Sequence, residues 1–171
     1  MKIKSLSHVG ITVSNFEKAV RWYWEMFKFP LVAEETMDVH QVEALYSLYG
    51  LKNTKLRLGF LRIPGGGVLE IFEFKPTIPA DKVCWNKIGF THITLDVGNV
   101  KKWYKKLKEK GVTFLCEPQK TGSNEWIFMK DMDGNLIELI DLKFNYIALR
   151  YLGAIVAPLL RRLQFGKYYK Q

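Results

Sequence analysis

Two histidines stand at matching positions of a repeated segment. Residues 7–16 align without a gap over residues 91–100, and this places His8 over His92. Imidazole nitrogens are ligands of borderline divalent ions such as zinc, nickel, cobalt, iron and manganese. A single strand histidine is more often a hydrogen-bonded structural residue, but a recurring one indicates a role shared by both copies.

Two glutamates recur in the same way. Glu70 and Glu138 each stand within an apolar run, four residues after a turn glycine, Gly66 or Gly134. Burying a carboxylate among apolar residues is costly unless it is paired or bound to a metal. A lone strand glutamate is often an ion-pair partner, yet two matching pairs favour one metal site. If the copies pack as partners, its ligands are predicted to be His8, Glu70, His92 and Glu138.

Other polar residues fit plainer interpretations. His40 lies in a segment that the second copy lacks, and we expect it to be a surface or structural residue. Glu73 falls on the strand face opposite Glu70 and is left out of the site. Asp131 and Asp133 are expected to shape a turn.

Apolar and polar residues alternate around each histidine, and this pattern indicates a half-buried strand. Asn15 and Asn99 follow these strands and are good N-caps for helices over residues 16–27 and 100–110. In the second helix the lysines cover the solvated face beside an apolar stripe, and Gly111 is a natural stop.

Each copy closes with a predicted hairpin, so the unit is β-α-β-β-β. The hairpin strands are expected near residues 56–63 and 68–72, and near 126–130 and 136–140. Residues 36–53 have no counterpart and are expected to include an inserted helix. We therefore predict an α+β fold of two tandem modules. A single domain spans residues 1–143, with modules over residues 4–75 and 88–143 and a linker over residues 76–87. A helical, basic extension follows over residues 144–171.

Composition narrows the class of protein. A hydrophobic fraction of 48% and a charged fraction of 25% are ordinary for a globular chain. Two cysteines and a start without a signal-peptide run favour a cytoplasmic setting. The net charge of +9 suits an acidic metabolite, and no nucleic-acid-binding motif accompanies it, so we expect no nucleic-acid partner.

Residues 7–13, 69–73, 91–93 and 131–139 together carry a family resemblance. The sequence resembles the vicinal oxygen chelate superfamily, which contains glyoxalases, bleomycin resistance proteins and extradiol dioxygenases, over residues 5–142. The glyoxalase I and methylmalonyl-CoA epimerase branch is the nearest. The resemblance implies a cup-shaped mixed sheet with helices outside, one divalent metal in the cup and a homodimer.

The same resemblance implies a lyase or isomerase. In that branch the metal holds two neighbouring substrate oxygens and stabilises an enediolate or enolate, while a carboxylate moves a proton. Glu138 is the first choice for this catalytic base and Glu70 the second. The expected substrate is a small carbonyl compound or thioester, acidic or thiol-conjugated.

Two other functions stay open. An extradiol-type dioxygenase would bind non-haem iron through three protein ligands, and the position of Glu70 would not hold a ligand. A non-catalytic resistance or binding protein would often lose the ligands, whereas all four are present here.

The extension is apolar from Phe144 to Leu160 but is interrupted by Arg150, Gly153 and Pro158. It is short and interrupted for a membrane span. We expect a helix that docks on the domain or on a second subunit. A helix lying on a membrane surface is the alternative.

Overall fold

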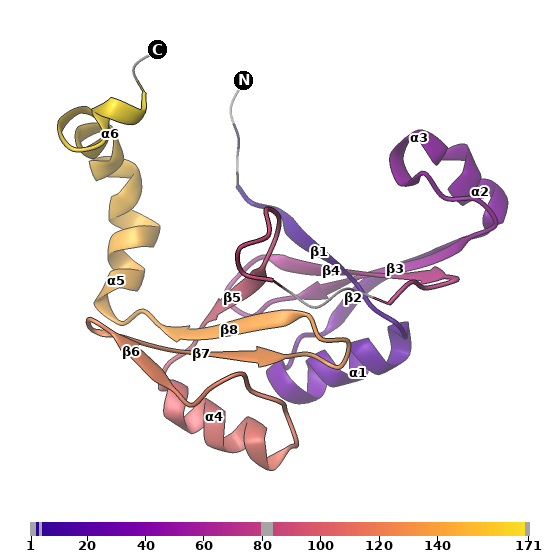
Figure 1. Cartoon of the computed structure of the whole chain (residues 1–171), viewed down its shortest axis with the longest axis horizontal. Helices are drawn as coiled ribbons and strands as arrows, with labels where there is room; N and C mark the ends of the chain where they lie inside the picture. The colour runs from indigo at the N-terminus through magenta and orange to yellow at the C-terminus, as the bar shows by residue number, and fades with distance from the viewer. Residues whose placement is uncertain (1–2, 4, 80–83, 170–171) are drawn as a thin grey trace. The chain divides into compact units, whose positions relative to one another are not determined.

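Two copies of the repeated module follow each other along the chain in the computed structural model (Figure 1). The structure describes residues 3, 5–79 and 84–169. The first copy consists of β1 (His8–Thr12), α1 (Phe16–Phe27), β2 (Leu31–Met37), α2 (Val39–Ala44), α3 (Tyr46–Tyr49), β3 (Lys55–Arg62) and β4 (Val68–Lys75). The second copy consists of β5 (His92–Asp96), α4 (Val100–Glu109), β6 (Gln119–Thr121), β7 (Asn124–Lys130) and β8 (Leu136–Asp141). A helical segment follows, made of α5 (Phe144–Ile147), a π-helical turn η1 (Ala148–Leu152), α6 (Gly153–Leu163) and a 3₁₀ turn η2 (Gly166–Tyr168).

The strand order is the same in both copies. The first sheet has the order β1-β4-β3-β2 and the second has the order β5-β8-β7-β6. In the first sheet β1 runs parallel to β4, while β2 and β3 are antiparallel to their neighbours. The predicted α+β fold with two βαβββ modules is therefore confirmed. Residues 80–83 of the predicted linker lie outside the described residues.

The chain forms two compact units that do not coincide with the two copies. The first unit combines Met1–Ile93 with Lys130–Leu136, and the second combines Thr94–Met129 with Ile137–Gln171. The turn after β7 therefore belongs to the unit that contains α1.

The capping residue and the apolar stripe of α1 are those that the sequence predicts. The Asn15 side chain accepts a hydrogen bond from the Lys18 amide at 2.9 Å. The buried residues of the helix are Phe16, Ala19, Tyr23, Met26 and Phe27. Gly59 of β3 lets this helix approach closely, because a Cβ there would lie 2.6 Å from Cζ of Phe16. The absence of a side chain at position 59 therefore allows α1 to pack directly against β3.

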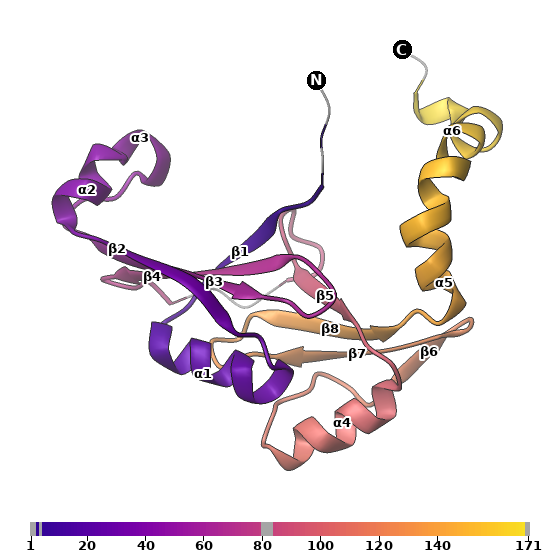
Figure 2. The same cartoon turned by 180° about the vertical axis from the view of Figure 1, so that it is seen from behind.

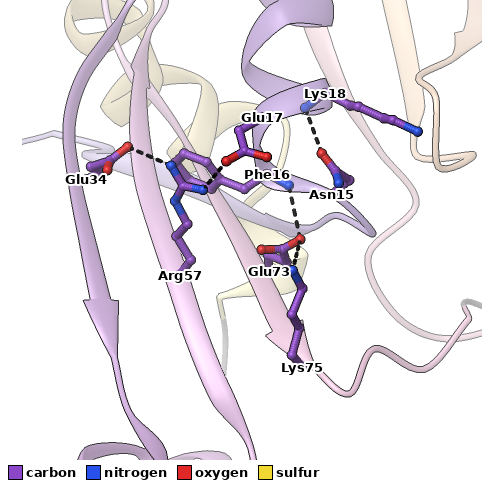
Figure 3. Close-up of polar contacts among 8 residues, drawn as sticks. All are labelled: Asn15, Phe16, Glu17, Lys18, Glu34, Arg57, Glu73 and Lys75. Carbon is purple, nitrogen blue, oxygen red and sulfur yellow. Dashed lines mark hydrogen bonds and ion pairs between the residues drawn. The ribbon is translucent and has the colours of Figure 1, made fainter.

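A polar cluster fixes the start of α1 to the sheet (Figure 3). Arg57 binds Glu17 at 2.7 Å and Glu34 at 3.4 Å, and its guanidinium lies 4.2 Å from the ring centre of Phe16. The hydrogen bond from Arg57, followed by its charge, lowers the pKa of the Glu17 carboxyl. Glu73 is buried and accepts a bond from the Phe16 amide at 3.4 Å. The face opposite Glu70, where the sequence places Glu73, is therefore the α1 face.

The turn after β7 is organised by a buried aspartate. Asp131 accepts hydrogen bonds from the backbone amides of Asp133 at 2.9 Å and Asn135 at 2.8 Å. It also accepts a bond from the Tyr23 hydroxyl at 3.0 Å, and Asp133 accepts one from the Ser14 amide at 3.0 Å. Asp131 and Asp133 therefore shape this turn, as expected.

The insert of the first copy is helical, as expected. Asp38 and Gln41 form a reciprocal capping box at the start of α2. Val42 is fully buried and packs with Leu56 and Leu58 of β3. The insert thus extends the apolar surface of the first sheet.

In the second unit α4 is the predicted amphipathic helix. Asn99 accepts a hydrogen bond from the Lys102 amide at 3.0 Å, Val100 and Leu107 are buried, and the lysines of the helix are exposed.

In the part of the chain that the structure describes, no helix combines the length and apolar character needed to cross a membrane.

Candidate metal centre

His8 and Glu70 form the first half of the predicted site. The parallel pairing of β1 with β4 sets Glu70 opposite Gly10, two residues after the histidine. Nε2 of His8 lies 3.3 Å from Oε2 of Glu70, and the Glu70 side chain is only 13% exposed. A sheltered carboxylate whose oxygen faces an imidazole nitrogen is a donor pair suited to a borderline divalent ion.

A hydroxyl group orients each histidine in the same way. Nδ1 of His8 lies 3.2 Å from Oγ of Ser7, and Nδ1 of His92 lies 2.8 Å from Oγ1 of Thr91. A proton on Nδ1, donated to the hydroxyl, leaves the Nε2 lone pair free for a metal. The repeat therefore conserves the orienting contact of the histidine as well as the histidine itself.

The two glutamates have different neighbours. Glu70 lies beside Gly10, where a Cβ would be 3.0 Å from Cε2 of Phe72 and 3.8 Å from Oε2 of Glu70. At the matching position of the second copy Thr94 donates a hydrogen bond to Oε2 of Glu138 at 2.8 Å. Alignment of the two copies places Gly10 over Thr94, but the sequence alone did not indicate that one carboxylate is held by a hydroxyl.

The structure places the predicted ligands in part. It brings His8 and Glu70 together in the first unit and joins Glu138 to Thr94 in the second. The ring of His92 lies 5.8 Å from that of Trp85, between ring centres. Among the described residues, no group of three or more histidine, cysteine, aspartate or glutamate side chains is arranged to hold a metal. The convergence of all four ligands stays a prediction.

The sheet face around Glu70 changes from polar to apolar along the strands. In strand register His8 aligns with Val68 and Arg62, and Glu70 aligns with Gly10 and Phe60. Further rows on this face hold Phe72 with Leu58 and Phe74 with Leu56. The rings of Phe72 and Phe74 are parallel at 6.0 Å, and Tyr49 of the insert meets Phe74 edge-on at 5.6 Å. One end of this face therefore offers charged and donor groups and the other an aromatic wall.

His40 and the two cysteines are not among the predicted ligands. His40 is exposed on α2, which agrees with its interpretation as a surface residue. Cys84 and Cys116 are both free thiols.

Comparison with known proteins defines the family. The sequence model of the Glyoxalase/Bleomycin resistance protein/Dioxygenase superfamily matches residues 5–139. The chain belongs to this superfamily. Its similar sequences include the metallothiol transferase FosB of Staphylococcus haemolyticus, which is 24% identical over 140 residues, spanning 80% of this chain and 83% of FosB.

Solved structures of the superfamily share the fold. A glyoxalase family protein from Bacillus cereus superposes with a TM-score of 0.69 at 20% identity, covering 82% of this chain and 95% of that protein. The fosfomycin resistance protein FosX from Listeria monocytogenes, solved with Mn(II) and sulfate, gives a TM-score of 0.58 at 18% identity, covering 84% and 97%. Members of the superfamily thus include proteins that hold a divalent metal.

Proposed function

We propose that the protein is a divalent-metal-dependent lyase or isomerase that moves a proton on the carbon next to a substrate carbonyl. The observation that carries this proposal is the pairing of His8 on β1 with Glu70 on β4 at 3.3 Å, on the first and last strands of a superfamily module. His92 and Glu138 occupy the matching positions of the second module. All four side chains would hold one ion, chosen from zinc, nickel, cobalt, iron and manganese.

Each residue of the proposed site has a distinct task. The ion, when bound, supplies Lewis-acid stabilisation of negative charge on the substrate oxygens. Glu138 is the proposed base that takes the proton, with Glu70 second, because a carboxylate can accept a proton from a carbon acid placed within its reach. Thr94 donates a hydrogen bond to Oε2 of Glu138 and would hold this carboxylate in position.

The substrate class follows from the sheet face around Glu70. A carbonyl or thioester head would lie near His8 and Glu70, and the apolar part of the molecule would lie along Phe72 and Phe74. Arg62, which shares a row with Val68 and His8, offers a cation for an acidic group at the polar end. We therefore propose a small carbonyl or thioester substrate with an apolar portion.

A second candidate function is transfer of a thiol to an electrophilic substrate. It is favoured by the similarity to a protein named metallothiol transferase, which extends over most of both chains. The same metal set would serve it, because a metal ion also activates a leaving oxygen. The two candidates differ in whether a thiol is consumed.

Metal binding is the first test. Protein purified without added metal, then dialysed against Mn²⁺ or Zn²⁺, is expected to retain close to one ion per chain by elemental analysis. His8→Ala should lower that occupancy strongly, because it removes one half of the closest donor pair. His40→Ala is the matched control, since His40 is an exposed histidine on α2, and it should retain the wild-type occupancy. Equal occupancy in wild type and His8→Ala would contradict the proposal.

Activity distinguishes the candidates. Deuterium incorporation from D₂O at the carbon next to a carbonyl, lost in Glu138→Gln, supports the lyase or isomerase. Consumption of a thiol without such exchange supports the transferase. Oxygen uptake with catechols by the iron-loaded protein would point to a dioxygenase. Ligand binding unchanged by His8→Ala and without bound metal would point to a non-catalytic binding protein.

We also propose a homodimer in the cytoplasm. The free thiols Cys84 and Cys116 suit a reducing compartment. Sedimentation equilibrium of the full chain is expected to give twice the chain mass of 19.9 kDa.

A further inference from the structure

We propose that residues 144–169 form a helix that binds the surface of an anionic lipid bilayer. The feature behind this inference is the segment that follows β8. It lies outside the match to the superfamily, which ends at residue 139. The proposal is independent of the metal site.

The start of the segment is hydrogen-bonded to β7. The Asn145 side-chain amide donates to Oδ1 of Asn124, the first residue of β7, at 2.9 Å. Beyond that point none of the residues of α6 is buried, and α6 makes its main contacts with η1 and η2, its neighbours along the chain. Figures 1 and 2 show α5 and α6 extending away from the second sheet. Helix α6 therefore contributes no buried residue to its own compact unit.

The exposed surface of the segment is apolar to an unusual degree. Most of its large apolar side chains are at least two fifths exposed, including Phe144, Ile155, Leu159, Leu163, Tyr168 and Tyr169. In α6, Ile155, Leu159 and Leu163 recur every four residues, and this spacing aligns them on one side of a helix. Leaving such a stripe in water is unfavourable, so its burial would drive association.

The charge of residues 144–171 indicates the kind of surface that the segment binds. Residues 144–171 contain five basic residues and no aspartate or glutamate, so they carry +5 of the net charge of +9. Arg150, Arg161 and Arg162 are exposed along the helix. Two copies packed against each other would gather arginines without a carboxylate from this segment to neutralise them. An anionic lipid surface supplies the negative charge and accepts the apolar side chains at the same time.

Three tyrosines lie next to these cations. The guanidinium of Arg161 is 5.9 Å from the ring centre of Tyr169, and that of Arg150 is 5.6 Å from Tyr146. The ammonium of Lys167 is 4.9 Å from the ring of Tyr168. Tyrosine rings beside cations suit the headgroup layer, where an apolar ring and a polar hydroxyl both find partners.

Co-sedimentation of the full chain with vesicles tests the proposal. Vesicles of phosphatidylcholine with phosphatidylserine are expected to bind the protein, and vesicles of phosphatidylcholine alone to bind it at least tenfold more weakly. Arg161→Glu combined with Arg162→Glu should weaken binding to the anionic vesicles by about tenfold or more, because each replacement turns an attraction to the anionic surface into a repulsion. Leu159→Asn combined with Leu163→Asn should also weaken binding.

The matched control is Lys101→Glu combined with Lys102→Glu on α4, an exposed pair in the same unit. It makes the same change in net charge and should leave binding within about twofold, since charges far from the surface are screened. Equal loss in this control would overturn the proposal, because total charge would then explain the binding. Absence of binding to anionic vesicles would overturn it as well. The helix would be assigned to a contact with a second copy if two results came together. The wild type would not bind vesicles, and the variant with Leu159→Asn and Leu163→Asn would show a lower mass in sedimentation equilibrium.

Discussion

The hydroxyl of Tyr23 donates a hydrogen bond to Oδ2 of Asp131 at 3.0 Å, across 108 positions of the sequence. Tyr23 is fully buried in α1, and Asp131 is buried in the turn after β7. Both belong to the first compact unit. This bond therefore ties a helix of the first copy to a turn contributed by the second.

Tyr23→Phe is expected to destabilise the fold by about 1.5–3 kcal/mol, because the hydroxyl bonds to a buried carboxylate. Asp131 would keep its backbone donors but lose the one that comes from α1. Urea unfolding monitored by circular dichroism measures the change. Tyr168→Phe is the control, since Tyr168 is 71% exposed, and its effect should stay within about 0.5 kcal/mol. Equal stability of the two variants would contradict this role.

The same pair predicts sensitivity to alkaline pH. Burial, followed by the charge of Asp131, raises the pKa of Tyr23 well above its ordinary value. The contribution of the neutral phenol to stability is therefore fully present below the unfolded pKa of about 10 and is lost as the pH rises toward the folded pKa. The difference in unfolding free energy between wild type and Tyr23→Phe should be constant from about pH 8 to 9.5 and shrink above about pH 10. A constant difference through about pH 11 would contradict the prediction.

The two helix caps should respond differently to alanine. Asn15 and Asn99 each accept a bond from the amide three residues later. Asn15 has an extended backbone, whereas Asn99 has φ of 60°. Asn15→Ala should cost about 1 kcal/mol for the lost cap. Asn99→Ala should cost about 1 kcal/mol more, because alanine disfavours the left-handed region. Asn99→Gly should recover that second part, and thermal unfolding would show the order of the three variants.

The contact between Thr94 and Glu138 predicts a positioning role for the hydroxyl. Thr94→Val, which keeps the shape and removes the hydroxyl, should lower kcat or metal affinity by about tenfold or more. Thr94→Ser should stay close to wild type, because it keeps the donor. Wild-type kcat and metal affinity in Thr94→Val would exclude the role.

Much of the local structure was predictable because it depends on short-range patterns. Alternation around His8 and His92 identifies the first strands, and Asn15 and Asn99 mark the helix starts. The structure then pairs β1 with β4, and this pairing brings Glu70 to His8. The residues that approach across the chain were not predictable. Nothing near Tyr23 in the sequence indicates Asp131 as its partner, and no local signal distinguishes a glutamate beside glycine from one held by Thr94.

The helical segment after β8 shows the same limit. Its helicity and basic character are evident from composition, but its apolar spacing suits a core as well as a lipid surface. The structure adds that Leu159 and Leu163 are exposed, which the sequence pattern does not indicate.

The inclusion of Lys130–Leu136 in the first unit has a consequence for protein synthesis. A chain emerges from the ribosome beginning at its N-terminus, so β1 through β4 are complete long before Asp131 is translated. Until then the amide of Ser14 and the hydroxyl of Tyr23 lack the carboxylates to which they donate hydrogen bonds in the finished protein. Translation must therefore pass the turn after β7 before the first half of the chain can reach its final packing.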